Sequence, residues 1–121
     1  MITGRVSALH LLVSIPFRRS GTQDVAIECV VDTGFTGELC LPPNAVAALE
    51  LPFRYELQVR LADDSALLLR VHNAIIVWSG VARDIDVLAT GKRPLIGTAL
   101  LDGFELLSQF RENGLVTIAE L

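Results

Sequence analysis

Apolar and polar residues alternate with a period of two along most of this chain, and that period is typical of half-buried β-strands. Residues 9–15 and 24–31, with a proline- and glycine-containing turn between them, predict a first hairpin. A longer hairpin is predicted from the alternation at residues 55–61, the polar tip at residues 62–65 and the apolar segment 67–78. Further strands are predicted at residues 39–41, 81–89, 95–97, 104–110 and 115–121, and short helices at residues 45–49 and 98–101.

The number and spacing of these strands indicate the class of fold. About eight short strands separated by regular turns predict an all-β fold of the small barrel or sandwich type. The 121 residues, of which 51% are hydrophobic, are enough for one domain with a single core. We therefore expect residues 1–121 to form one domain.

Charge and hydropathy exclude several classes of partner. The chain has a formal net charge of −4 and lacks the clustered basic residues with which proteins bind nucleic acid or membrane surfaces. No apolar run approaches the roughly 18 residues of a transmembrane segment. The first five residues lack the basic start and apolar middle of a signal peptide. We therefore expect a cytoplasmic protein without nucleic-acid or membrane partners.

Two cysteines and two histidines are the residues that would first suggest metal or thiol chemistry. Cys29 lies in phase with its apolar neighbours on a predicted strand, and we expect Cys29 and Cys40 to be buried free thiols. Neither has neighbours that would stabilise a thiolate. His10 is expected at the surface and His72 in a structural role. These scattered positions do not make a zinc site, and no metal or other cofactor is predicted.

The most informative stretch is residues 29–41, where an apolar strand ends at Asp32 and a second apolar segment begins at Leu39. A carboxylate at the end of a buried strand is costly unless it is hydrogen-bonded or functional. Gly34 and Gly37 mark places where the backbone bends or approaches another segment closely. Asp32 is therefore a candidate site residue, although an Asp-Thr-Gly tripeptide alone is also an ordinary turn.

Three features in this order resemble the retroviral-type aspartic proteases: a strand ending in Asp32-Thr33-Gly34, a long hairpin in mid-chain, and the segment Leu95-Ile96-Gly97 near the end. The likeness is closer to their small prokaryotic relatives, in which Asp-Thr-Gly-Phe-Ser/Thr-Gly and Pro-Leu-Ile/Leu-Gly segments recur together. It covers essentially the whole chain. The resemblance implies a small closed β-barrel of the retropepsin-like type with one or two short helices.

The resemblance also implies a homodimer, because these enzymes use two carboxylates and this chain has a single Asp-Thr-Gly. Asp32 of each protomer would lie at the two-fold axis, where the pair activates the water that hydrolyses a peptide bond. Thr33 matches the position whose hydroxyl bonds to the partner's loop. Gly34 matches the place where the turn backbone lies close to the carboxylates. The segment that packs beneath this loop in the family corresponds to Leu95, Ile96 and Gly97.

The mid-chain hairpin resembles the flap that covers the substrate in these proteases. Substrate would bind as an added extended strand, and the resemblance assigns its contacts to Phe35 and to the hairpin tip, Ala62, Asp63, Asp64 and Ser65. Viral members usually have a small residue in place of Phe35, so we expect Phe35 to narrow the cleft or form a specificity wall. Glycine is common where Asp63 and Asp64 stand, so we expect slower flap motion or a preference for basic substrates.

Two other functions fit parts of the sequence. A dimeric peptide-binding module of the same fold would be catalytically silent, although such a module has no need for a costly buried acid. A metal hydrolase would instead need four carboxylates to converge on one ion: Asp63, Asp64, Asp84 and Asp86.

Terminal strands interleave between protomers in viral members of the family. Here residues 1–8 and 116–121 are the candidates for that role.

Overall fold

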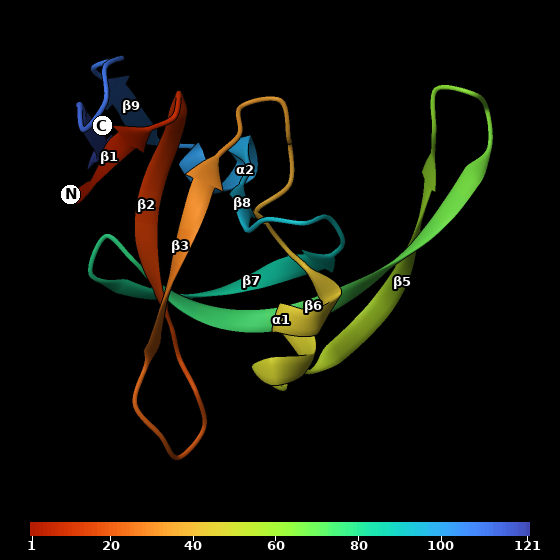
Figure 1. Cartoon of the computed structure of the whole chain (residues 1–121). Helices are drawn as coiled ribbons and strands as arrows, with labels where there is room; N and C mark the ends of the chain where they lie inside the picture. The colour runs from red at the N-terminus through yellow and green to blue at the C-terminus, as the bar shows by residue number, and fades with distance from the viewer.

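The computed structural model describes residues 1–121 as ten β-strands in one sheet, with two short helices (Figure 1). In chain order the elements are β1 (Ile2–Ser7), β2 (His10–Phe17), β3 (Val25–Val31), β4 (Leu39–Leu41), α1 (Pro43–Ala48), β5 (Phe53–Arg60), β6 (Ala66–Trp78), β7 (Val81–Ala89), β8 (Leu95–Ile96), α2 (Thr98–Leu101), β9 (Phe104–Ser108) and β10 (Leu115–Glu120).

The strands follow one another across the sheet in the order β5-β6-β7-β4-β8-β3-β2-β1-β10-β9. Most neighbours are antiparallel, but β3 pairs with β8 and β4 pairs with β7 in parallel. One further pair, Phe17 opposite Ile76, joins β2 to β6. The predicted all-β fold is therefore confirmed. The Phe17–Ile76 pair joins β2, β3, β8, β4, β7 and β6 into a ring, from which β5 extends at one end of the sheet and β1, β10 and β9 at the other.

Local sequence explains where most elements begin and end. The first predicted hairpin is present as β2 and β3, with Val13 opposite Cys29. Leu9 was assigned to the first strand but lies in a tight turn, where Ala8 and Leu9 have φ of 49° and 69°. Two successive positive φ angles suit the twist of a hairpin. Helix α1 begins at Pro43, because proline is favoured in the first turn, where its missing N–H is not needed.

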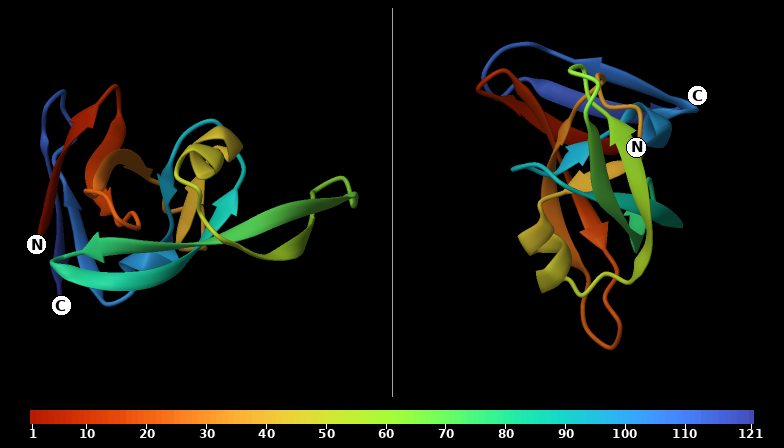
Figure 2. Two further views of the ribbon diagram at one scale, coloured as in Figure 1. Left: turned by 90° about the horizontal axis from the view of Figure 1, so that it is seen from below. Right: turned by 90° about the vertical axis from the view of Figure 1, so that its right-hand side faces the viewer.

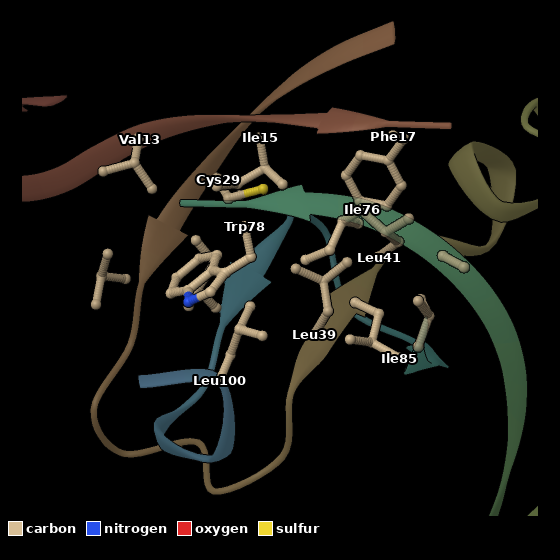
Figure 3. Close-up of a cluster of buried hydrophobic side chains, with 14 of the residues drawn as sticks. Val13, Ile15, Phe17, Cys29, Leu39, Leu41, Ile76, Trp78, Ile85 and Leu100 are labelled. Atoms are coloured by element: carbon tan, nitrogen blue, oxygen red, sulfur yellow. The ribbon is translucent and has the colours of Figure 1, made fainter. Parts of the chain in front are cut away.

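Figure 3 shows core side chains from β2, β3, β4, β6 and β7, with Leu100 of α2. Side chains from four further elements complete the core: Val6 of β1, Val46 of α1, Ile96 of β8, and Val116 and Ile118 of β10. Its largest members, Trp78 and Phe17, are at most 1% exposed, and no charged or polar residue is buried with them. Full burial of each such side chain contributes about 1.5–3 kcal/mol to folding. Cys29 and Cys40 are both buried and free, so the prediction of buried thiols is confirmed.

The second predicted hairpin is present as β5 and β6, but its apolar face is not covered. On this face Leu57, Leu61 and Leu67 are 40–44% exposed, and in β5 only Val59 is partly buried. Leu68 lies opposite Gln58 on the other face and is 63% exposed. The expectation of half-buried strands was wrong here because no core residue comes from β5 or from residues 61–70, and β7 pairs with β6 only from Arg70 onward. The tip of the hairpin therefore projects from the rest of the sheet, as Figure 1 and the left view of Figure 2 show.

Candidate active site

Asp32 lies directly after the last residue of β3, at the start of a tight turn. The Gly34 amide donates a hydrogen bond to Asp32 Oδ1 at 2.9 Å, and the Phe35 amide donates to the Asp32 carbonyl oxygen at 3.1 Å. A Cβ atom on residue 34 would lie 3.2 Å from Oδ1, which is tighter than an ordinary contact. Glycine at this position therefore lets the backbone lie against the carboxylate, as the sequence predicts.

Strand β8 holds the Asp32 turn from one side. Val31 is the parallel partner of Ile96, and the Asp32 amide donates to the Ile96 carbonyl oxygen at 2.9 Å. On its other edge β8 pairs with β4, where Leu39 lies opposite Ile96. The two ends of the loop between β3 and β4 are thus fixed to the same two residues of β8. Figure 1 shows this loop beside β8 and α2.

Gly97 brings the middle of the loop against the start of α2. Its amide donates to the Glu38 carbonyl oxygen at 3.0 Å, and the next amide, of Thr98, donates to the Phe35 carbonyl oxygen at 2.8 Å. A Cβ atom on residue 97 would lie 2.1 Å from the Gly37 carbonyl oxygen and 2.7 Å from the Phe35 ring. Because such distances cannot be accommodated without movement, this position requires glycine. The structure therefore places Leu95, Ile96 and Gly97 against the Asp32 loop.

The functional groups of the turn are accessible from solvent. Asp32 is half-buried, whereas Thr33 and Gly34 are exposed. Within the chain, the Asp32 side chain accepts a hydrogen bond only from the backbone amide of Gly34. The Thr33 hydroxyl makes no hydrogen bond within the chain. The turn thus presents a carboxylate and a free hydroxyl on one surface.

A pocket of about 370 Å³ opens beside Asp32, and its lining includes residues from three separate segments. These residues are His10, Val30, Val31, Asp32, Thr33, Arg93 and Leu95. His10 is exposed, as predicted, but sequence reasoning did not place it near Asp32. Arg93 was missed altogether. The sequence signal for Arg93 was its position just before the Pro-Leu-Ile-Gly segment. Because Leu95 of this segment pairs with Val30, Arg93 lies near the end of β3 that carries Asp32.

The predicted substrate contacts lie elsewhere in the isolated chain. The Phe35 ring packs against Gly37 and Gly97 within the loop and does not line the pocket beside Asp32. Its role as a wall of the substrate cleft stays a prediction. The hairpin tip, Ala62, Asp63, Asp64 and Ser65, does not line this pocket either.

The hairpin tip has a well-defined turn of its own. Asp63 Oδ1 accepts hydrogen bonds from the Ser65 amide at 3.0 Å and the Ser65 hydroxyl at 2.5 Å, and these bonds lower the pKa of the Asp63 carboxyl. Asp64 adopts a φ of 70° and forms an ion pair with Arg60 at 2.9 Å. A non-glycine residue in this conformation is uncommon, although aspartate tolerates it better than most.

The acids considered for a metal hydrolase do not converge. Asp84 and Asp86 both lie within ion-pair distance of Arg54, at 3.7 and 2.8 Å, and Asp86 also accepts a hydrogen bond from the Tyr55 hydroxyl at 3.1 Å. This hydrogen bond is the main reason why the pKa of Tyr55 is raised. The other two acids lie at the hairpin tip. No group of three or more metal-ligating side chains is placed to hold an ion.

The thiols and the second histidine are structural. Burial, reinforced by the neighbouring Glu28 charge, raises the pKa of Cys29 to about 12, and burial also raises the pKa of Cys40. A thiolate, which is the nucleophilic form, is therefore disfavoured at both positions. His72 Nδ1 lies 2.9 Å from the Leu51 carbonyl oxygen, and its ring packs edge-on against Phe53.

Comparison with solved structures identifies the class of fold. The chain is similar to the crystal structure of a retropepsin-like aspartic protease from Rickettsia conorii, with a TM-score of 0.58 and 16% sequence identity over 98% of this chain and 90% of that one. No protein-family model and no curated protein sequence matches the chain. Neither helix is long and apolar enough to cross a membrane. The fold is therefore that of the retropepsin-like aspartic proteases, as the sequence resemblance predicts.

Proposed function

We propose that this protein is an aspartic endopeptidase that acts as a homodimer, with Asp32 of each protomer in one catalytic dyad. The observation that supports this most strongly is the Asp32-Thr33-Gly34 turn, which is fixed to β8 and Gly97 and presents its carboxylate to solvent in a retropepsin-like fold. We expect a cytoplasmic enzyme that has a peptide or protein substrate, needs no cofactor and has no nucleic-acid or membrane partner.

The dimer supplies the second carboxylate. A two-fold interface brings the same surface of both chains together, so a residue near the axis meets its own copy. The accessible Asp32 carboxylate and the unpaired Thr33 hydroxyl are suited to such an arrangement. We expect Thr33 to donate its hydroxyl proton to the backbone of the partner's loop and so hold both turns in register.

The chemistry follows from two close carboxylates that share one proton, which is the known behaviour of aspartic protease dyads. The ionised carboxylate accepts a proton from water while the water oxygen bonds to the peptide carbonyl carbon. The protonated carboxyl donates to the carbonyl oxygen, which gives a neutral tetrahedral intermediate. When the carbon–nitrogen bond breaks, the protonated carboxyl gives its proton to the nitrogen and the other carboxylate takes a proton from a hydroxyl of the intermediate. The products are an amine and a carboxylic acid, and the dyad again holds a single proton.

The β5–β6 hairpin is the proposed cover of the cleft. Its exposed leucines have no partner in the single chain, and a bound peptide or the second protomer would cover them. An extended peptide would then bind as an added strand, with main-chain hydrogen bonds for affinity and side-chain pockets for selectivity. The contacts assigned to Phe35 and to residues 62–65 belong to this closed dimeric state.

Asp32→Asn tests the proposal directly. The variant should keep the fold and the dimer but lose cleavage of a peptide library between about pH 4 and 7, by about 10²–10⁴-fold or more, because it removes proton transfer. Asp102→Asn is the matched control, since Asp102 is exposed at the end of α2 and has no ion pair. Undiminished cleavage by Asp32→Asn would overturn the proposal.

Solution mass as a function of protein concentration tests the dimer. Sedimentation should show a dimer that dissociates on dilution, in parallel with a loss of activity. A persistent monomer would leave each Asp32 without its partner and would contradict the dyad. A dimer that binds peptides but cleaves none would instead support the catalytically silent binding module.

A further inference from the structure

The pocket beside Asp32 has a distinctive combination of surfaces. Val30 and Val31, each 8% exposed, and Leu95 give it apolar walls. The charged or titratable side chains that line it are Asp32, His10 and Arg93. Two of these three side chains are basic, although the chain as a whole has a net charge of −4.

The Arg93 charge is not used inside the chain. Arg93 is exposed and takes part in none of the six ion pairs, whereas arginines of β1, β5 and β7 each have a carboxylate partner. A guanidinium group is always charged and has planar, paired donors that fit a carboxylate. An unpaired arginine at the rim of an apolar pocket therefore suits a ligand side chain with a methylene stem and a carboxylate end.

We infer that Arg93, assisted by His10, selects a substrate with an acidic side chain next to the bond that is cleaved. This inference rests on the proposed function, since the pocket acquires this meaning from its position beside Asp32. The two-fold symmetry of the proposed dimer places one such pocket on each side of the dyad. Acidic residues on either side of the scissile bond should therefore be favoured. This preference is opposite in sign to the one expected from Asp63 and Asp64 at the hairpin tip.

Peptides that differ only by Glu or Gln measure this preference. A library that carries Glu, Gln or Lys in turn at each position is assayed for kcat/KM and, separately, for Kd at about pH 6, where a glutamate side chain is ionised. Wild-type protein should favour Glu over Gln next to the cleaved bond by about fivefold, the upper range for an exposed ion pair. Arg93→Gln should abolish this ratio, and Arg93→Glu should invert it in favour of Lys.

Lys92→Gln and Lys92→Glu are the matched controls. Lys92 is the exposed neighbour of Arg93 on the same loop but does not line the pocket, so these variants make the same charge change outside it. They should leave the Glu-to-Gln ratio close to that of the wild type. Wild-type indifference to Glu, or equal effects of the Lys92 and Arg93 variants, would overturn the inference.

The two readouts separate this inference from the proposed function. If the wild type cleaves no peptide, the proposed endopeptidase is wrong, and the Kd values alone decide whether the pocket prefers acidic ligands. If cleavage is present and depends on Asp32 but the Glu-to-Gln ratio is one, the proposed function stands and the role of Arg93 is wrong.

Discussion

Replacement of Gly97 by alanine tests how the Asp32 turn is held. The added methyl carbon would lie 2.1 Å from the Gly37 carbonyl oxygen and 2.8 Å from the Phe35 carbonyl oxygen. Non-bonded heavy atoms pack at about 3.5 Å, so the loop must move by about 1 Å or more. Both obstructing atoms belong to the backbone, so no side-chain rotation can relieve the overlap.

The movement should lower the stability of the fold. Overpacking in a well-packed region costs about 1–3 kcal/mol. The displaced loop also carries the hydrogen bonds that Phe35 and Gly37 accept from the first residues of α2, at 2.8 and 3.2 Å. Weakening them adds about 1 kcal/mol. We therefore expect Gly97→Ala to lower the free energy of unfolding by about 2–4 kcal/mol.

Urea unfolding followed by tryptophan fluorescence measures this loss. Trp78 is the only tryptophan and is 1% exposed, so its emission reports the loss of the core. Gly103→Ala is the control, because it has φ of +86° but open space around the Cβ position. Its cost is that of the backbone conformation alone, about 1–2 kcal/mol.

Activity gives a second, independent measure. A shift of about 1 Å in a catalytic group can cost about 10²-fold in rate. Without urea, where both proteins are folded, Gly97→Ala should therefore reduce the rate of peptide cleavage far more than Gly103→Ala does. If Gly97→Ala is no less stable and no less active than Gly103→Ala, the close approach at Gly97 does not hold the turn.

Two further predictions concern Cys29 and the exposed hairpin. The pKa of Cys29 is raised from 9.0 to about 12 by folding, so its contribution to stability is complete below pH 9 and is lost as the pH rises toward 12. This change in pKa corresponds to about 4 kcal/mol of stability. The free energies of unfolding of wild type and Cys29→Ala, measured by urea titration, should approach each other between pH 9 and 12. Free energies that change in parallel with pH would contradict the prediction. Leu68→Ser should change the free energy of unfolding by less than about 0.5 kcal/mol, because Leu68 is 63% exposed, whereas buried Leu39→Ala should cost about 2–5 kcal/mol. A stability loss as large as that of Leu39→Ala would show that the hairpin is already packed within one chain.

Much of the fold was predictable because its signals are local. Alternating residues and turn residues located both hairpins, and the end of an apolar strand at Asp32 located the candidate turn. The resemblance predicted that Leu95-Ile96-Gly97 would lie against this turn. Each of these predictions depends on short stretches whose chemistry is visible without knowledge of the rest of the chain.

The features that were missed depend on long-range pairing. His10 and Arg93 meet beside Asp32 only because β2 and β8 both lie next to β3 in the sheet. Alternation predicted that one face of β5 would be covered, but it could not show that no part of the core packs against β5 or that β7 stops pairing with β6 at Arg70. The position of the Phe35 ring depends on the close approach of Gly97, which no local pattern encodes.

The position of β8 has a consequence for how the chain folds. This strand of two residues lies between β3 and β4, which end 64 and 54 residues before it begins, and no neighbouring turn guides it there. Contacts between residues so distant in sequence are slow to form, because the loop-closure entropy is lost before the contacts are gained. The hairpins can form early, but the Asp32 turn has its hydrogen-bonding partner only after β8 has inserted. We therefore expect the Asp-Thr-Gly turn to become ordered late in folding, so that a chain whose β8 has not yet been synthesised cannot complete this candidate site.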